Sequence, residues 1–251
     1  MTPVELAGLA AAGFVAATMN AIAGGGSFVS FPALIFAGVP GVAANASSTV
    51  ALFPGTLASS WAYRKVIGGF GGVPLPLLLA ISCAGGLCGA LLLLFTPAVA
   101  FDGLVPWLLL VASVTFAFGK QAGEALRRRV RLGRGPLMAA QFVLGVYGGY
   151  FGGAVGIMMM AAWMLLGQVD LKALNATRML LVSMMNGIAV VCFILAGIVE
   201  WPQTLALLCG SVAGGYGGAR LVRGMDPHKF RRLVIVLTFT MTALFFLRRY
   251  W

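Results

Sequence analysis

Long apolar stretches separated by short polar segments form the main pattern of this chain. A stretch of about 20 apolar residues predicts a helix that crosses a membrane, because a helix rises about 1.5 Å per residue and the hydrocarbon core is about 30 Å thick. Such stretches predict full spans near residues 46–63, 74–95, 104–119, 177–196, 203–220 and 233–247. The pattern therefore predicts an all-α integral membrane protein.

Two further apolar stretches, residues 3–37 and 136–167, are interrupted by glycines. A run of about 30 residues would form a helix of about 45 Å, too long for one span and too short for two. We therefore predict that each stretch is a broken helix, two shorter pieces meeting at the glycines. Tight packing of an unbroken helix through small residues is the alternative. Whether each broken segment crosses the membrane is left open.

The breaks point to a candidate binding site. Exposed backbone groups are tolerated within a membrane only where protein buries them or where they line a cavity. Helix N-termini carry partial positive charge and free N–H donors. The pieces at 27–37 and 157–167 would both direct such donors at the cavity. An anion site is expected there.

The two halves of the chain also resemble each other. SCAGGLCGA at 82–90 matches SVAGGYGGA at 211–219, and the triplet at 45–47 (NAS) matches that at 175–177 (NAT). Gly26 matches Gly156 with nearly the same offset. We predict homologous halves at 1–119 and 136–251, joined by a basic cytoplasmic linker at 120–135. Three full crossings in each half would make them inverted repeats, a recurring plan of secondary transporters.

Composition sharpens the class of protein. Of the 251 residues, 61% are hydrophobic and only 9% are charged, whereas soluble domains carry about 25% charged residues. The net charge of +11 would suggest nucleic acid as a partner for a soluble protein. In a membrane protein, the same excess marks cytoplasmic loops that face anionic lipid. We therefore expect a lipid bilayer, and no nucleic acid, around this chain.

The positions of the charges predict an orientation. Basic residues gather near 64–65, 120–134 and 220–232, which should face the cytoplasm. Asp102 and Glu200 lie in short linkers without a basic residue, which should face outward. Arg248 and Arg249 disagree with this orientation, since it would place them outside. Eight spans, with each broken segment crossing once, is the alternative topology.

Polar residues within the predicted spans are the candidate ligand-binding groups, because buried polar groups in membranes are often functional. Asn175 and Asn186 are eleven residues apart and share a helix face, and Asn45 and Thr56 repeat this spacing in the first half. Arg178, which we place at the start of a helix, could balance the charge of an anion. Hydrogen bonds between helices and contact with lipid headgroups are the alternatives.

Other chemistry finds little support in the sequence. His228 is the single histidine, and the four cysteines show no CxxC spacing, so no metal site and no cofactor are expected. No Asp or Glu lies in the middle of a predicted span. Coupling to a proton or to sodium is therefore open, and no catalytic set indicates an enzyme.

Several segments together resemble the TauE/SafE sulfite exporter family. They are AGGGSFVSFPALIFAGVPGVAANASSTVALFPGTLASSWAYRK at 23–65, YGGYFGGAVGIMMMAAWMLLG at 147–167, NATR at 175–178 and GYGGARL at 215–221. The resemblance covers most of the chain and both halves. It implies a duplicated helical core and a permease for sulfur-containing or organic anions such as sulfite and sulfonates.

We therefore expect a secondary transporter of a small anion in the bacterial inner membrane. An uncoupled anion channel and a non-transport membrane assembly factor are the alternatives, and a homo-oligomer is an open question. The expected substrate-binding residues come from both breaks and from the polar helix faces: Gly24, Gly25, Gly26, Ser27, Asn45, Ser48, Gly152, Gly153, Gly156, Asn175, Thr177, Arg178 and Asn186.

Overall fold

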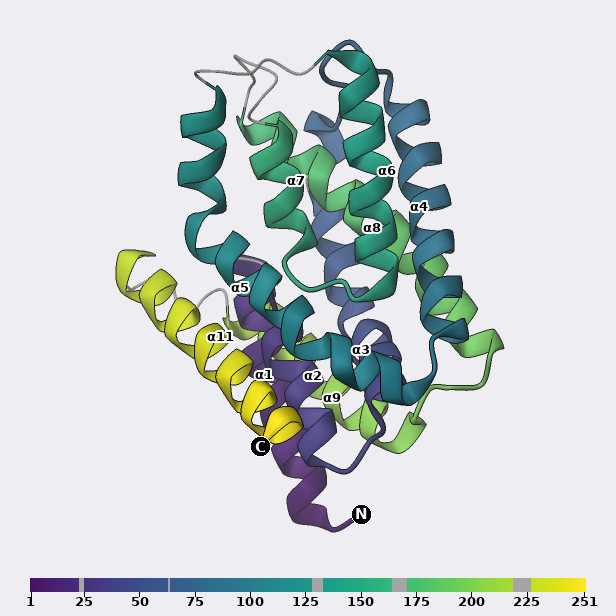
Figure 1. Ribbon diagram of the computed structural model, residues 1–251, viewed down its shortest axis with the longest axis vertical. Coiled ribbons are helices and arrows are strands. Elements are labelled where there is room, and N and C mark those ends of the chain that lie inside the picture. Colours follow the sequence, from purple (N-terminus) through teal and green to yellow (C-terminus); the bar gives the residue numbers. More distant parts are fainter. Residues whose placement is uncertain (23–24, 63, 128–132, 164–170, 219–226) are drawn as a thin grey trace.

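The computed structural model describes residues 1–22, 25–62, 64–127, 133–163, 171–218 and 227–251. The protein is 86% helical, and no strand occurs among these described residues. The all-α class predicted from the sequence is confirmed. The molecule is elongated, with both termini at one end. The C-terminal end of α5 (Ala98–Arg127) and the start of α6 (Arg134–Tyr150) lie at the other end (Figure 1).

Each half of the chain contributes a comparable series of helices. The first half forms α1 (Pro3–Ile22), α2 (Ser27–Phe36), α3 (Gly41–Ala62), α4 (Leu75–Phe95) and α5 (Ala98–Arg127). The second half forms α6 (Arg134–Tyr150), α7 (Val155–Trp163), α8 (Leu171–Leu195), α9 (Trp201–Ala213) and α11 (Pro227–Tyr250). A 3-10 turn at Arg64–Val66 follows α3, and a π turn at Gly214–Gly218 follows α9.

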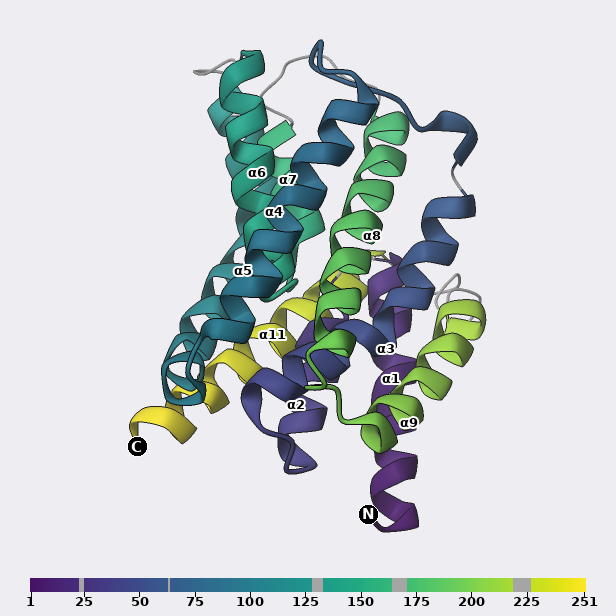
Figure 2. The same cartoon turned by 90° about the vertical axis from the view of Figure 1, so that its right-hand side faces the viewer.

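The helices pack into two bundles, and each bundle takes one helix from the other half of the chain. In one bundle α4 packs against α6 and α8; in the other, α9 packs against α1 and α3 (Figures 1 and 2). The bundles meet where α3 contacts α8, and α5 crosses α11 on the outside. The chain halves are therefore interlocked rather than side by side.

Glycines allow the closest helix contacts. A Cβ atom on Gly89 of α4 or on Gly149 of α6 would collide with the backbone of the facing helix. On the other side, a Cβ on Gly13 or Gly210 would collide with the backbone across the contact of α1 and α9. Small residues bring membrane helices together in this way, since lipid provides no hydrophobic drive for their association.

Several helix boundaries differ from those expected, and three of the differences affect the interpretation. α5 continues to Arg127 and so covers part of the basic linker, because charged residues mark the membrane surface without ending a helix. α8 begins at Leu171, which places Arg178 two turns inside the helix and not at its start. α9 ends at Ala213, where the GGYGG segment continues as a π turn.

The outer surface suits a lipid environment. Four helices among the described residues are long and apolar enough to cross a membrane: Leu75–Phe95, Ala98–Gly119, Ala173–Leu195 and Arg231–Tyr250. Large apolar side chains on these helices, such as Leu92 and Val236, are exposed. Exposed apolar surface of this extent is what a membrane-embedded protein presents to lipid tails.

Candidate functional site

A small cavity lies where the two bundles meet, between α3, α8 and the starts of α2 and α7. Its volume is about 80 Å³. A single water needs roughly 10–15 Å³ measured in the same way, so the cavity can hold an ion of a few heavy atoms. It is lined by residues of both halves: Asn20, Gly25, Ser27, Thr49, Leu52, Thr56, Gly152, Ala154, Val155, Gly156, Ile157, Arg178, Met179, Val182 and Asn186.

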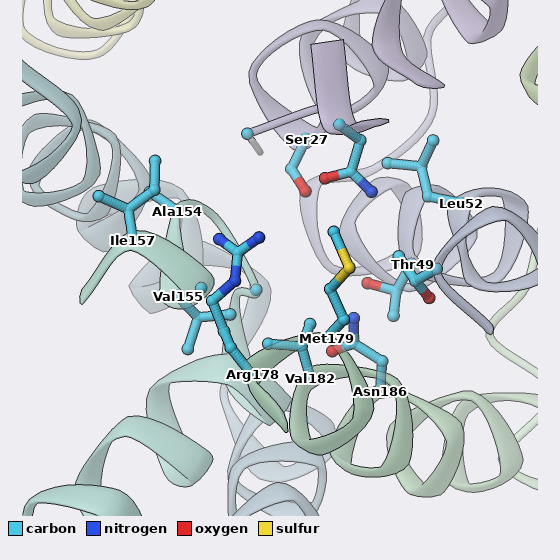
Figure 3. A pocket seen from close by; sticks show the side chains of 15 residues that line it. Ser27, Thr49, Leu52, Ala154, Val155, Ile157, Arg178, Met179, Val182 and Asn186 are labelled. Carbon is cyan, nitrogen blue, oxygen red and sulfur yellow. The ribbon is translucent and has the colours of Figure 1, made fainter. Parts of the chain in front are cut away.

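Arg178 provides the charge of this cavity. Its side chain extends from α8 so that the guanidinium lies between Ile157 on one side and Ser27 on the other (Figure 3). Its buried Nε has no hydrogen-bond partner among the described residues, and no residue lining the cavity is acidic. Arg178 as a whole is half-buried. Partial burial of an unpaired charge is costly in a membrane, and a bound anion would lower that cost.

Gly156 makes room for this guanidinium at the first turn of α7. A Cβ atom at position 156 would lie 3.0 Å from Nη1 of Arg178 and 3.4 Å from its Cδ. Glycine therefore lets the cation lie directly beside the backbone at the helix start.

The turn before α7 adds a set of backbone donors. The amide N–H groups of Gly153, Ala154, Val155 and Gly156 donate no hydrogen bond to any described residue. Gly152 has a φ of 75° and Ala154 a φ of 56°, so the chain turns through left-handed conformations. Successive amides in such a turn form a concave anion site, and the helix dipole strengthens it. A strained residue other than glycine also indicates a functional turn.

Asn186 lies two turns beyond Arg178 on the same face of α8. Its buried Oδ1 has no hydrogen-bond partner among the described residues. Across the cavity, the hydroxyls of Thr49 and Thr56 donate to the backbone oxygens of Asn45 and Phe53, at 2.9 and 2.8 Å. The two threonine hydroxyls therefore have no proton left to donate to an anion. The donors that remain in the lining are Arg178, the backbone amides before α7, and the side chains of Asn20, Ser27 and Asn186.

The structure brings together part of the predicted set. Of the thirteen expected residues, those that line the cavity are Gly25, Ser27, Gly152, Gly156, Arg178 and Asn186. Gly24 lies outside the described residues. The others lie elsewhere: Gly26, Asn45, Ser48, Gly153, Asn175 and Thr177.

Several of the residues outside the cavity hold the framework of the site. Asn45 donates from Nδ2 to the carbonyl oxygen of Tyr150 at 2.8 Å, which fixes the end of α6 just before the turn. Ser48 shares a hydrogen bond of 2.6 Å with Ser30, and this bond joins α3 to α2. These residues position the breaks without facing the ligand space.

Gly26, Gly153 and Thr177 also have packing roles. A Cβ on Gly26 would lie 2.5 Å from the carbonyl oxygen of Ala16, and one on Gly153 would lie 2.8 Å from the Phe151 ring. Thr177 exchanges hydrogen bonds with the backbone N–H and carbonyl of Gly68, at 3.2 and 2.9 Å. Asn175 lies on α8 one turn before Met179, beyond the cavity.

Sequence reasoning missed Asn20 and Thr49 among the polar lining residues, and it named Thr56 on a polar helix face without including it in the expected binding set. A signal for Thr49 was present, since it lies one turn after Asn45 on the same helix. The cavity is lined by Asn186 and by Thr49 and Arg178, which lie about one turn further along α3 and α8 than Asn45 and Asn175. The apolar lining residues gave no sequence signal, because they resemble any other core residue.

Comparisons with known proteins place this architecture. Residues 9–245 match the family described as "Sulfite exporter TauE/SafE". The chain belongs to this family. A "Probable membrane transporter protein" of Haemophilus influenzae is 31% identical over 95% of this chain and 93% of that protein. The "Probable membrane transporter protein YfcA" of Escherichia coli strain K12 is 27% identical over 97% of this chain and 90% of its own.

A third relative extends the same similarity to another genus. The "Probable membrane transporter protein ORF9" of a Sinorhizobium species is 27% identical over 93% of this chain and 89% of that protein. No solved structure matches the chain. The family, the relatives and the apolar helices together identify an integral membrane transporter of the TauE/SafE type.

Proposed function

We propose that this TauE/SafE protein is a secondary transporter of a small oxyanion, with sulfite or a sulfonate as the substrate class. The observation that carries the proposal is the guanidinium of Arg178, which faces a cavity with no acidic lining residue and whose buried Nε has no partner among the described residues. The same cavity includes free backbone amides at the start of α7. Planar guanidinium groups and helix N-termini both favour oxyanions.

The size of the cavity supports a compact ligand. With about 80 Å³ available, sulfite or the sulfonate group of a larger molecule would fill the space. One oxygen would accept from Arg178, and others would accept from the amides of Val155 and Gly156. Asn186 would donate from its amide nitrogen, and its buried Oδ1 could accept the proton of a hydrogensulfite ion.

The packing of the helices supports alternating access. When each helix is replaced by its counterpart in the other half, the contact of α4 with α6 corresponds to the contact of α9 with α1. The contact of α4 with α8 likewise corresponds to the contact of α9 with α3. All four contacts are present in the structure. The contacts of α3 with α8 and of α5 with α11 are unchanged by this exchange. This symmetry supports inverted repeats, in which the bundles rock about the α3–α8 contact and expose the cavity alternately.

We place the protein in the bacterial inner membrane, with the basic residues near 120–134 toward the cytoplasm. The lining residues hold no carboxylate that could carry a coupling proton. A proton carried on the substrate, or sodium at backbone carbonyls, would then provide the coupling. We propose no enzymatic activity for the chain.

Flux of radiolabelled sulfite into proteoliposomes tests the proposal. Arg178→Gln should abolish saturable uptake, and Arg178→Lys should retain only part of it, since lysine keeps the charge but loses the planar donor pair. Arg232→Gln removes an exposed cation of α11 and is the matched control. Unchanged uptake with Arg178→Gln would refute the site.

Counterflow separates the transporter from a channel. Vesicles preloaded with unlabelled sulfite should accumulate labelled sulfite transiently, because a carrier exchanges one anion for another. Flux that rises linearly with concentration and shows no counterflow would instead identify an uncoupled channel. A native protein that moves no anion and is purified with a stoichiometric partner would favour an assembly factor.

A further inference from the structure

A second cavity opens at the end of the molecule that carries the C-terminus. Its volume is about 280 Å³, larger than that of the central cavity. The charged groups in its lining are Asp102 at the start of α5 and the pair Arg248 and Arg249 at the end of α11. All three side chains are exposed, and none forms an ion pair with another described residue. The cavity thus has an excess of one positive charge that is free to meet a ligand.

The position of these arginines needs an explanation. Asp102 lies in the second turn of α5, within the segment that is expected to face outward, and Arg248 and Arg249 share its cavity. They therefore lie at the end of the molecule opposite the C-terminal end of α5 and the start of α6 (Figure 1). Cations on the outer side run against the usual charge asymmetry of membrane proteins. A binding role for an anionic ligand accounts for this departure.

One face of α2 connects the two cavities. Ser27 lines the central cavity, while Phe31 and Ile35, one and two turns later, line the second. Residues four apart lie above one another on a helix, so this face forms a continuous wall between the two spaces.

Aromatic rings close the space between the cavities. Phe31 is 1% exposed, and its ring centroid lies 5.8 Å from that of Phe151 and 5.6 Å from that of Phe245. Phe151 directly precedes Gly152, which lines the central cavity. The contact between Phe31 and Phe151 joins the two broken segments, so any movement of one bundle against the other must change it.

We propose that the second cavity is the outer vestibule of the transport path, in which Arg248 and Arg249 bind a small oxyanion before the Phe31–Phe151 contact opens. Passage to the central cavity rests on the transport function proposed above, whereas attraction of the anion into the vestibule does not. Asp102 limits the excess charge, so that the anion is held weakly and can leave for the inner site.

Thiol labelling tests the vestibule without requiring transport. Pro40→Cys places a reporter on the exposed rim, in a protein whose four cysteines (Cys83, Cys88, Cys192 and Cys209) are replaced by serine. The ratio of modification rates for an anionic sulfonatoethyl and a cationic trimethylammonioethyl thiosulfonate is measured at low salt. Arg248→Gln with Arg249→Gln should lower this ratio about tenfold, and Asp102→Asn should raise it.

A matched control lies on the same helix. Lys229→Gln with Arg232→Gln removes the same charge from exposed positions at the other end of α11 and should leave the ratio unchanged. An equal effect of both pairs would show a general surface potential and overturn the proposal. No effect of the Arg248 and Arg249 pair would overturn it as well.

Sulfite uptake then tests the place of the vestibule in the path. The double substitution of Arg248 and Arg249 should raise KM about fivefold with little change in kcat, since capture and not translocation is impaired. The effect should persist in vesicles of phosphatidylcholine alone. An effect confined to vesicles with phosphatidylglycerol would mean that the arginines bind a lipid phosphate, which overturns a substrate role.

The Phe31–Phe151 contact, which we call the gate, is tested by a separate labelling experiment. Phe31→Leu keeps the core apolar but removes the ring, and it should speed labelling of Ser27→Cys from the outer side severalfold. Phe36→Ala, on an exposed position of α2, is the control. Unchanged labelling in a monodisperse Phe31→Leu protein would overturn the gate. Absence of sulfite flux in the native protein would refute the proposed function, while the rim labelling would still decide the vestibule.

Discussion

Gly156→Ala should impair anion binding without impairing the fold. The new Cβ would lie 3.0 Å from Nη1 of Arg178, whereas an unstrained contact requires about 3.5 Å. The guanidinium is the flexible end of its side chain, so it should yield by about 0.5 Å and lose its alignment with the bound oxyanion. Alanine is also a better helix former than glycine, so α7 should form at least as readily.

The expected loss follows from the hydrogen bond involved. A hydrogen bond to a charged group contributes about 1.5–3 kcal/mol. Loss of the lower value corresponds to a roughly tenfold rise in KM for sulfite. The assay is the initial rate of uptake against sulfite concentration in proteoliposomes, with thermal unfolding of the same preparation in detergent recorded alongside.

Gly55→Ala is the matched control for this substitution. Gly55 lies on α3 next to Thr56, and a Cβ at this position would meet no atom within 4 Å. Its KM should equal that of the native protein. If Gly156→Ala also leaves KM unchanged, Arg178 is not confined by α7 in the way that binding requires, and the proposed geometry is refuted.

Three further substitutions separate binding from packing. Asn186→Asp should abolish sulfite uptake at neutral pH, because the negative charge of the new carboxylate would cancel the positive charge that Arg178 brings to the cavity. Uptake equal to that of the native protein would contradict the electrostatic argument. Thr177→Val removes two hydrogen bonds to Gly68 and should lower the unfolding free energy by about 1–3 kcal/mol, with KM unchanged in the uptake assay. Gly149→Ala should lower the free energy of unfolding by at least about 1–3 kcal/mol, because its Cβ would collide with the backbone of α4. A native-like midpoint of thermal unfolding would contradict this prediction and show that the α4–α6 contact can relax.

Much of the helical framework could be predicted from local sequence properties. The apolar stretches predict an all-α membrane protein because the bilayer imposes length and hydropathy on each crossing helix. Arg178 was singled out as a cation at the start of a predicted span, where it could balance the charge of an anion, and the structure places it two turns inside α8. The polar faces of α3 and α8 followed from helical periodicity, which is a property of the chain alone.

The candidate site itself could be predicted only in part. Asn45 and Thr49 belong to the same face of α3, yet only Thr49 lines the cavity, while Asn45 bonds to the end of α6. Which of the two residues lines the cavity depends on the point along α3 at which the turn between α6 and α7 packs against it. No periodicity contains this distance, since it is set by the packing of helices from different parts of the chain.

The sequence by itself determined the class of the protein, predicted the two glycine breaks and singled out Arg178 as a candidate, because each follows from the cost of placing polar groups in lipid. Only the tertiary structure decided that α4 and α9 are exchanged between the bundles and that Gly156 lies against Arg178. It also placed Arg248, Arg249 and Asp102 around one cavity. These arrangements depend on contacts between residues distant in the chain, where close packing and not local propensity determines which groups meet.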